Sequence, residues 1–134
     1  MERRTVSLVN GTMFNLRILV VEDTLENMDL ICLILEQAGH QVFRAYNGVQ
    51  GSEMALQEQP DLILLDLALP DKDGFSVAAE LKADIITKSI PIIAISAHSM
   101  REFKERALDV GCEAFIAKPF TLNAISKEIE RFLF

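Results

Sequence analysis

Charged and hydroxyl side chains interrupt the apolar runs of this chain at comparable places. The stretch DLILLDLALPDKDG carries Asp66 inside an apolar run, where an unpaired carboxylate is costly to bury. Glu22 and Asp23 directly follow the apolar run LRILVV. Ser96 and Lys118 stand near the ends of two later apolar runs. Each residue alone is typical of a turn, a cap or a solvated surface, so the joint placement is the signal.

Together these side chain types predict a site for a cation and a phosphoryl group. Three carboxylates at one place repel one another, which either raises the pKa of one of them or demands a cation. A small, hard cation with oxygen ligands and retained waters describes Mg²⁺, with Mn²⁺ as an alternative. A lysine adds a fixed positive charge for phosphoryl oxygens, and a serine hydroxyl adds a hydrogen-bond donor. We therefore expect phosphoryl transfer to a carboxylate nucleophile.

Five short apolar runs alternate with five helical patterns, which indicates a parallel sheet covered by helices on both faces. We expect strands at 16–21, 41–46, 61–67, 91–97 and 112–118, and helices at 24–39, 48–59, 75–84, 99–111 and 121–134. The chain is thus predicted to form one doubly wound α/β domain over residues 15–134, after a flexible extension, residues 1–14. Ligands of such sheets bind at the carboxyl ends of the strands, where the polar residues fall.

The predicted helix over residues 24–39 is more apolar than one buried stripe requires. The stripe that we expect to pack on the sheet is formed by Leu25, Met28, Cys32 and Leu35. The run LICLIL adds further apolar residues to this helix. Deep packing on the sheet would account for them, and a docking face for a protein partner is the alternative.

The two cysteines, Cys32 and Cys112, stand in apolar surroundings without the spacing of metal ligands. We expect both to be reduced residues of the core. A single disulfide between them is the alternative.

The composition disfavours several classes of protein. Thirteen basic and twenty acidic residues give a net charge of −7, whereas binding to nucleic acid requires a basic face. No apolar run is long enough to span a membrane, and the N-terminus lacks the apolar segment of a secretory signal. We therefore expect a cytoplasmic protein. Because neither glycine-rich phosphate-loop pattern is present, the phosphoryl donor should be a protein or a small molecule rather than a nucleotide.

Four motifs in order along the chain resemble the receiver domain of bacterial two-component signalling, the response regulator family. They are VVED, LLDLALPDKDG, IAISA and AKPF. The resemblance covers residues 15–134 and extends to single-domain regulators of the chemotaxis and cell-division types. It implies a flavodoxin-like fold, with a five-stranded parallel sheet in the order 2-1-3-4-5 and five helices.

The resemblance implies separate roles for the acidic residues at a magnesium site. Asp66 would be the phosphoacceptor and a metal ligand, and Asp23 would be a direct ligand. Glu22, which stands where aspartate is common, would act on the metal mostly through water. The backbone carbonyl of Ala68 would be a further ligand, in a loop shaped by residues 70–74.

The resemblance also implies a switch that responds to phosphorylation. Ser96, in place of the commoner threonine, would bond the phosphoryl group, and Lys118 would pair with it. Phe115 occupies the aromatic switch position without a hydroxyl, so its movement would be read by packing. The Lys118–Pro119 peptide resembles one that is cis in this family. The surface that changes on activation would lie within residues 99–134.

A histidine kinase or a histidine phosphotransfer protein is the partner that the resemblance implies. Its docking face would comprise Asn27, Leu30, Ile34 and Phe120. The 99–134 face would contact a downstream protein, and the chain would be a monomer or a weak dimer through this face. Nucleic acid and membrane are not expected partners.

Other readings of the sequence stay open. The initial methionine and the closing helix favour a stand-alone regulator over a receiver excised from a hybrid histidine kinase. An inactive receiver-like module that binds a partner without phosphorylation is a further alternative, although every required site residue is present. A phosphatase on a similar fold would need a second acid where Ala68 stands. We therefore expect no enzyme, beyond catalysis of the chain's own phosphorylation and dephosphorylation.

Overall fold

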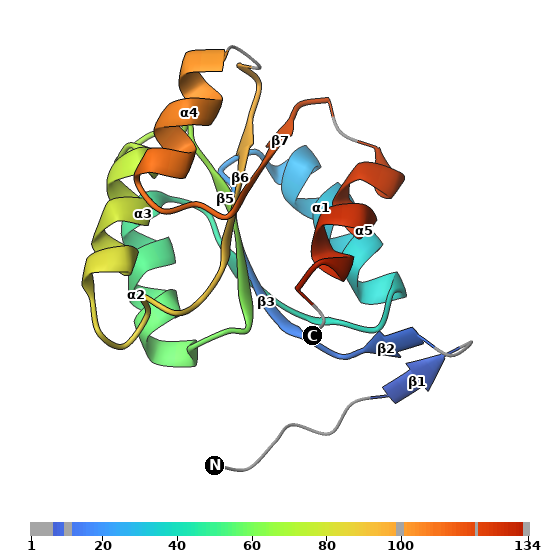
Figure 1. Cartoon of the computed structure of the whole chain (residues 1–134). Coiled ribbons are helices and arrows are strands. Elements are labelled where there is room, and N and C mark those ends of the chain that lie inside the picture. The colour runs from blue at the N-terminus through green and yellow to red at the C-terminus, as the bar shows by residue number, and fades with distance from the viewer. Residues whose placement is uncertain (1–6, 10–11, 99–100, 120, 133–134) are drawn as a thin grey trace.

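Five parallel strands form the central sheet of the computed structural model, which describes residues 7–9, 12–98, 101–119 and 121–132 (Figure 1). The strands are β3 (Arg17–Val21), β4 (Gln41–Ala45), β5 (Leu62–Asp66), β6 (Ile92–Ser96) and β7 (Ala114–Ala117). They lie in the order β4-β3-β5-β6-β7, and every neighbouring pair is parallel. Counted along the chain this is the order 2-1-3-4-5, so the predicted fold is confirmed.

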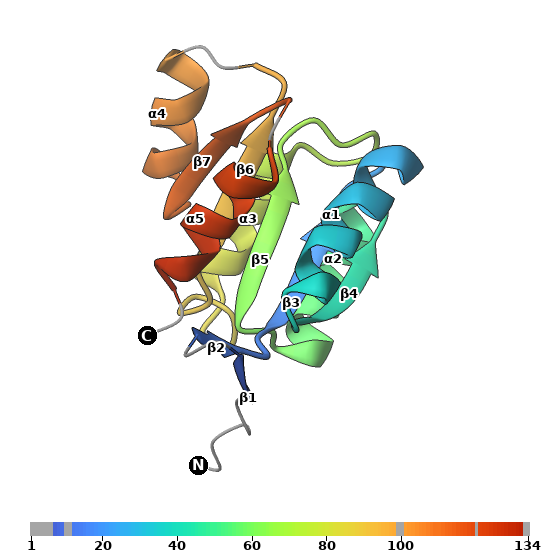
Figure 2. The same cartoon turned by 90° about the vertical axis from the view of Figure 1, so that its right-hand side faces the viewer.

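Helices cover both faces of the sheet, as expected (Figures 1 and 2). One face carries α1 (Leu25–Gln37) and α5 (Leu122–Glu130), and the other carries α2 (Gly48–Glu58), α3 (Gly74–Ala83) and α4 (Arg101–Asp109). The helix predicted over residues 121–134 ends at Glu130. Within the described ranges, no helix combines the length and the apolar character needed to cross a membrane.

The central strands are apolar between their ends because both of their faces are covered. In β3, Ile18 and Val20 pack in the core on the α1 and α5 side, while Leu19 and Val21 pack on the α2 to α4 side. All five residues of β5 are buried. This period-two division between two cores is what a doubly covered parallel strand requires. Because this alternation sets how each strand pairs with its neighbours, the carboxyl ends of the strands and the polar residues there lie at one edge of the sheet.

The predicted buried stripe of α1 is wrong at its first position. Leu25 is 65% exposed, whereas Ile31 is fully buried in its place. Leu25 begins the helix at the carboxyl edge, where the strands end and offer no surface to pack on. Leu30 and Leu33 are also 46% and 53% exposed, so deep packing accounts for Ile31 but not for these two leucines.

Both cysteines are free and buried, and the sheet separates them. Cys32 belongs to the core beneath α1 and Cys112 to the core on the opposite face, which excludes the disulfide. Burial raises the pKa of the Cys112 thiol to about 12 and also raises that of Cys32. The prediction of two reduced core cysteines is therefore confirmed.

A short hairpin precedes the domain and was not predicted. β1 (Ser7–Val9) pairs antiparallel with β2 (Thr12–Phe14), and the two form a sheet of their own. The hairpin lies at the amino edge of the main sheet, away from the carboxyl ends of its strands (Figure 2). Strands of three residues are too short to show a period in the sequence. The flexibility of residues 1–14 stays a prediction.

Candidate functional site

The five residues that the sequence singled out come together at the carboxyl edge of the sheet. Glu22 and Asp23 follow β3, Asp66 is the last residue of β5, and Ser96 is the last residue of β6. Lys118 is the residue directly after the end of β7. The order of the strands places β5 between β3 and β6, so Asp66 lies at the centre of the group.

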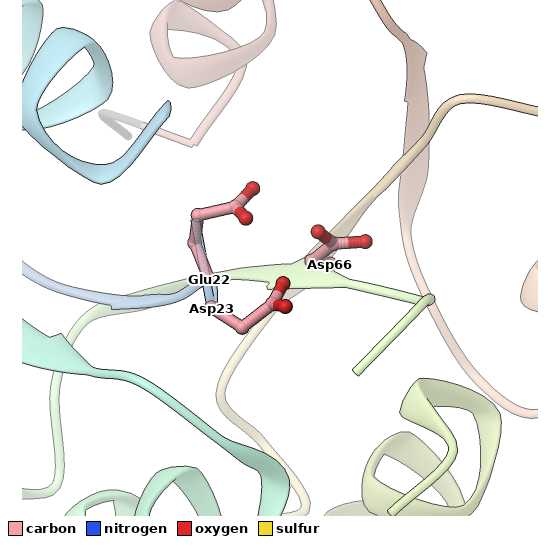
Figure 3. A group of neighbouring side chains, drawn as sticks. All are labelled: Glu22, Asp23 and Asp66. Carbon is pink, nitrogen blue, oxygen red and sulfur yellow. The ribbon is translucent and has the colours of Figure 1, made fainter. Parts of the chain in front are cut away.

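Three carboxylates form the centre of the site. The side chains of Glu22, Asp23 and Asp66 converge at the ends of β3 and β5 (Figure 3), and one ligand oxygen from each lies within 4.8 Å of the others. Glu22 and Asp66 are buried, whereas Asp23 is exposed. Solvent therefore reaches the group from the side of Asp23.

A single ammonium group contacts two of these carboxylates. Nζ of Lys118 donates to Oε1 of Glu22 and to Oδ2 of Asp66, in both cases at 2.9 Å. Burial acts to lower the pKa of Lys118, but the hydrogen bonds to Asp66 and Glu22 and the negative charges of these carboxylates together outweigh burial and raise it. The lysine is therefore charged at neutral pH.

Backbone amides fix the orientation of the two buried carboxylates. The amide of Ala68 donates to Oδ1 of Asp66 at 2.9 Å, and the amide of Thr24 donates to Oε2 of Glu22 at 3.0 Å. With the bonds to Lys118, each oxygen of both carboxylates has one donor. These carboxylates are thus held in place by groups within two residues of them and by one distant lysine.

The loop after β5 is closed tightly over the strand end. The amide of Gly74 donates to the carbonyl of Leu67 at 3.1 Å. A Cβ at position 74 would lie 2.5 Å from Cα of Leu67 and 2.6 Å from the carbonyl oxygen of Asp66. Only glycine fits this approach. Ala68 lies inside the closed loop and is exposed to solvent.

The two residues predicted to form the switch lie on neighbouring strands. Ser96 is fully buried, and its hydroxyl oxygen accepts a hydrogen bond from the amide of His98 at 3.0 Å. Phe115 of β7 pairs with Ala94 of β6, is half-buried, and packs against the core beneath α2 to α4. The Lys118–Pro119 peptide is cis, as the resemblance implied.

Two of the four predicted docking residues lie beside the carboxylates. Asn27 and Leu30 of α1 line a cavity of about 290 Å³ together with Ala97, Lys118 and Pro119. Ile34 is half-buried and packs against the core beneath α1, away from that cavity. Phe120 lies outside the described residues.

Comparisons with known proteins agree with this arrangement. The family model of the response regulator receiver domain matches residues 18–130. The chain belongs to this family. It is 36% identical over 116 residues to the polar-differentiation response regulator DivK of Brucella anthropi, which covers 87% of the chain and 94% of that protein.

Other relatives show that the same domain occurs in longer proteins. The chain is 37% identical over 117 residues to the transcriptional regulator RpaA of Synechocystis, of which it spans 48%. It is also similar to the receiver domain of the sensor histidine kinase PA1611 from Pseudomonas aeruginosa, with a TM-score of 0.82 and 31% identity. That match covers 88% of this chain and 97% of the other. The PA1611 structure has a magnesium ion coordinated in its active site cleft.

Proposed function

We propose that this receiver domain accepts a phosphoryl group on Asp66 from a phosphohistidine of a histidine kinase or a phosphotransfer protein. The observation that supports this most is the uneven charge of the site. Three carboxylates lie within 4.8 Å of one another, and one ammonium group contacts two of them. A balanced structural ion pair has no excess of one charge, whereas a site for a divalent metal ion needs spare negative charge before the ion binds.

The donor set fits Mg²⁺. All the candidate ligands are oxygen atoms, which hard cations prefer, and the exposed Asp23 leaves room for retained waters. We infer that Asp23, Asp66 and the carbonyl of Ala68 hold the ion directly and that Glu22 acts through water. When bound, the ion would neutralise the carboxylates and the phosphoryl oxygens.

The transfer itself balances without any further reactant. A carboxylate oxygen of Asp66 forms a bond to phosphorus while the bond from phosphorus to the donor's imidazole nitrogen breaks. The electron pair of the broken bond stays on that nitrogen, and the imidazole leaves as a neutral ring because its other nitrogen carries a proton. Lys118 would move from Asp66 to a phosphoryl oxygen, and the hydroxyl of Ser96 would donate to another.

The signal would leave the site through Ser96 and Phe115. In the present structure the amide of His98 donates to the hydroxyl oxygen of Ser96, so a turn of this side chain towards the phosphoryl group would break that bond. The half-buried ring of Phe115 would then repack, and the face formed by residues 99–134 would change. A downstream protein would bind this face, and the chain would act as a signalling phosphoacceptor rather than as an enzyme on other substrates.

Labelling with a small donor tests the proposed function. The protein is incubated with Mg²⁺ and acetyl phosphate and its intact mass is measured. We expect one phosphoryl adduct on the wild type and none on Asp66→Asn. Asp73→Asn is the matched control, because Asp73 lies in the same loop. Among the described residues its carboxylate accepts a hydrogen bond from the amide of Phe75 at 2.7 Å and forms an ion pair with Arg106, and neither partner is a residue of the site. Absence of labelling, also from a histidine kinase, would instead support an inactive interaction module.

A further inference from the structure

The carboxylate of Asp71 accepts hydrogen bonds from two successive backbone amides at the start of α2. Oδ1 accepts from Gly48 at 2.8 Å and Oδ2 accepts from Val49 at 3.0 Å. The first amides of a helix have no partner within it, so an outside acceptor satisfies them. The same two bonds lower the pKa of Asp71, and the charged carboxylate also suits the positive end of the helix dipole.

These bonds join two segments that are distant in the chain. Asp71 lies in the loop after β5, and Gly48 precedes it by 23 residues. The contact is also close in packing, because a Cβ on Gly48 would lie 2.8 Å from Cβ of Lys72 and 3.1 Å from its carbonyl oxygen. Lys72 forms an ion pair with Glu80 of α3. The tip of the loop is therefore held between α2 and α3.

Ala68 lies between this fixed tip and the fixed base of the loop. At the base, the amide of Gly74 donates to the carbonyl of Leu67, and the amide of Ala68 donates to Asp66. The carbonyl of Ala68 belongs to the next peptide unit, so its direction depends on the path of residues 69–71. The bonds of Asp71 set the end of that path.

We propose that Asp71 is a positioning residue for the metal site, which directs the carbonyl of Ala68 by clamping the loop onto α2. This inference rests on the proposed function, in which that carbonyl is a metal ligand. Groups that orient metal ligands from outside are commonly worth about 10-fold or more in metal affinity. Asp71 touches neither the metal nor the phosphoryl group in this account and is not a catalytic residue.

The alternative is that Asp71 only caps α2. Loss of a cap costs about 1 kcal/mol of stability and leaves metal affinity unchanged. Asp84 offers a matched control, because its Oδ1 accepts the amide of Ile86 at 2.8 Å at the opposite edge of the sheet. Asp84→Ala thus removes a carboxylate and a backbone hydrogen bond without touching the site.

The experiment measures the Mg²⁺ dissociation constant by titration calorimetry on the full chain, together with the rate of labelling by acetyl phosphate at saturating Mg²⁺. We expect Asp71→Ala to raise the dissociation constant about 10-fold while the labelling rate at saturation stays as in the wild type. Asp71→Asn keeps one acceptor oxygen and should lie between Asp71→Ala and the wild type. Asp84→Ala should bind Mg²⁺ as the wild type does.

A wild-type dissociation constant in Asp71→Ala would overturn the inference and leave the proposed function intact. So would an equal weakening in Asp84→Ala, because the effect would then be one of general stability. The variant Asp66→Asn distinguishes a failure of the proposed function from a failure of the role of Asp71. If the wild type binds Mg²⁺ no better than Asp66→Asn, the proposed function fails, and the role of Asp71 fails with it.

Discussion

The two edges of the sheet carry charged side chains in different proportions. At the amino edge, two ion pairs each join one cation to one anion. Arg17 pairs with Glu58 at 3.2 Å, and its amide donates to Asp61 at 2.7 Å. Lys82 pairs with Glu113 at 2.9 Å. These charges tie the starts of strands to the ends of helices.

The carboxyl edge lacks this balance. Lys118 is shared by Glu22 and Asp66, and Asp23 adds a third carboxylate without an ion pair among the described residues. An excess of one sign of charge is costly unless a ligand removes it, so structure alone gives no reason for it. The comparison teaches that the balance of charges, rather than their number, separates the edge whose ion pairs join strands to helices from the edge at which we propose that chemistry takes place.

Gly74→Ala should have the largest effect, because it forces the carboxyl edge apart. The new methyl group would lie 2.5 Å from Cα of Leu67 and 2.6 Å from the carbonyl oxygen of Asp66, and neither can move without the strand end. We expect a loss of about 3 kcal/mol in the free energy of unfolding, measured with urea. In the control Gly51→Ala the atoms nearest to the methyl group belong to the side chain of Val21, at 2.9 Å, rather than to the backbone. Equal losses in both variants would contradict this reading.

Lys118→Met and Lys82→Met compare the two edges directly, since the two lysine side chains are 17% and 15% exposed. Lys118→Met leaves Glu22 and Asp66 without a cation, and we expect a loss of about 2 kcal/mol in the absence of metal. Mg²⁺ should restore most of this stability, because it binds the unpaired carboxylates. Lys82→Met should show no larger response to Mg²⁺ than the wild type.

The unfolding temperatures of both lysine variants, measured with and without Mg²⁺, test this prediction. The comparison of edges would be wrong if Mg²⁺ stabilised Lys82→Met as much as Lys118→Met. It would also be wrong if Lys118→Met unfolded at the wild-type temperature without metal.

Asp23→Asn sharpens the comparison, because it removes charge from the carboxyl edge without breaking a hydrogen bond among the described residues. We expect the metal-free stability to change by less than about 0.5 kcal/mol, as for most surface substitutions. The stabilisation by Mg²⁺ should fall strongly, since Asp23 is a direct ligand of the ion in the site that we propose. Glu26→Gln removes an exposed charge from the first turn of α1 and is the control. An undiminished response to Mg²⁺ in Asp23→Asn would remove this residue from the site.

The smallest expected effect is a pH dependence of stability that arises from His40, which lies at the amino edge. Its Nδ1 accepts the amide of Leu16 at 3.1 Å, and burial lowers its pKa below the ordinary 6.5. The folded state therefore prefers the neutral ring, so stability is complete above pH 6.5 and declines as the pH falls through 6.5 towards the folded pKa.

The decline for one proton is at most about 1.4 kcal/mol per pH unit. Urea unfolding from pH 8 to pH 5 measures it. His40→Asn keeps an acceptor for Leu16 and should remove this part of the pH dependence. An unchanged pH profile in this variant would show that His40 does not contribute.

The sequence predicted most of the fold because the patterns of the central strands are strong, whereas that of β4 at the edge is weaker. Both faces of β5 are covered, so its residues are apolar without exception until Asp66. The same reasoning brought Glu22, Asp66 and Lys118 to one edge, because the ends of parallel strands must meet there. It failed at Leu25, since helical spacing alone does not say where the sheet ends beneath a helix.

Other features of the site depend on contacts that no local pattern records. The bond from Lys118 to Glu22 spans 96 residues, and that from Gly48 to Asp71 spans 23. Asp71 stands among turn residues, where an acidic side chain is common for local reasons. The sequence therefore pointed to the groups that we propose to react, but not to the residue that we infer to hold their loop in place.

Trapping the phosphorylated residue tests the central claim most directly. The protein is treated with acetyl phosphate in the presence of Mg²⁺ or a chelator, and borohydride then reduces any aspartyl phosphate to homoserine, which peptide sequencing locates. We predict homoserine at position 66 alone, and only in the sample with Mg²⁺. Homoserine at another aspartate, or equal trapping at position 66 without metal, would contradict the account.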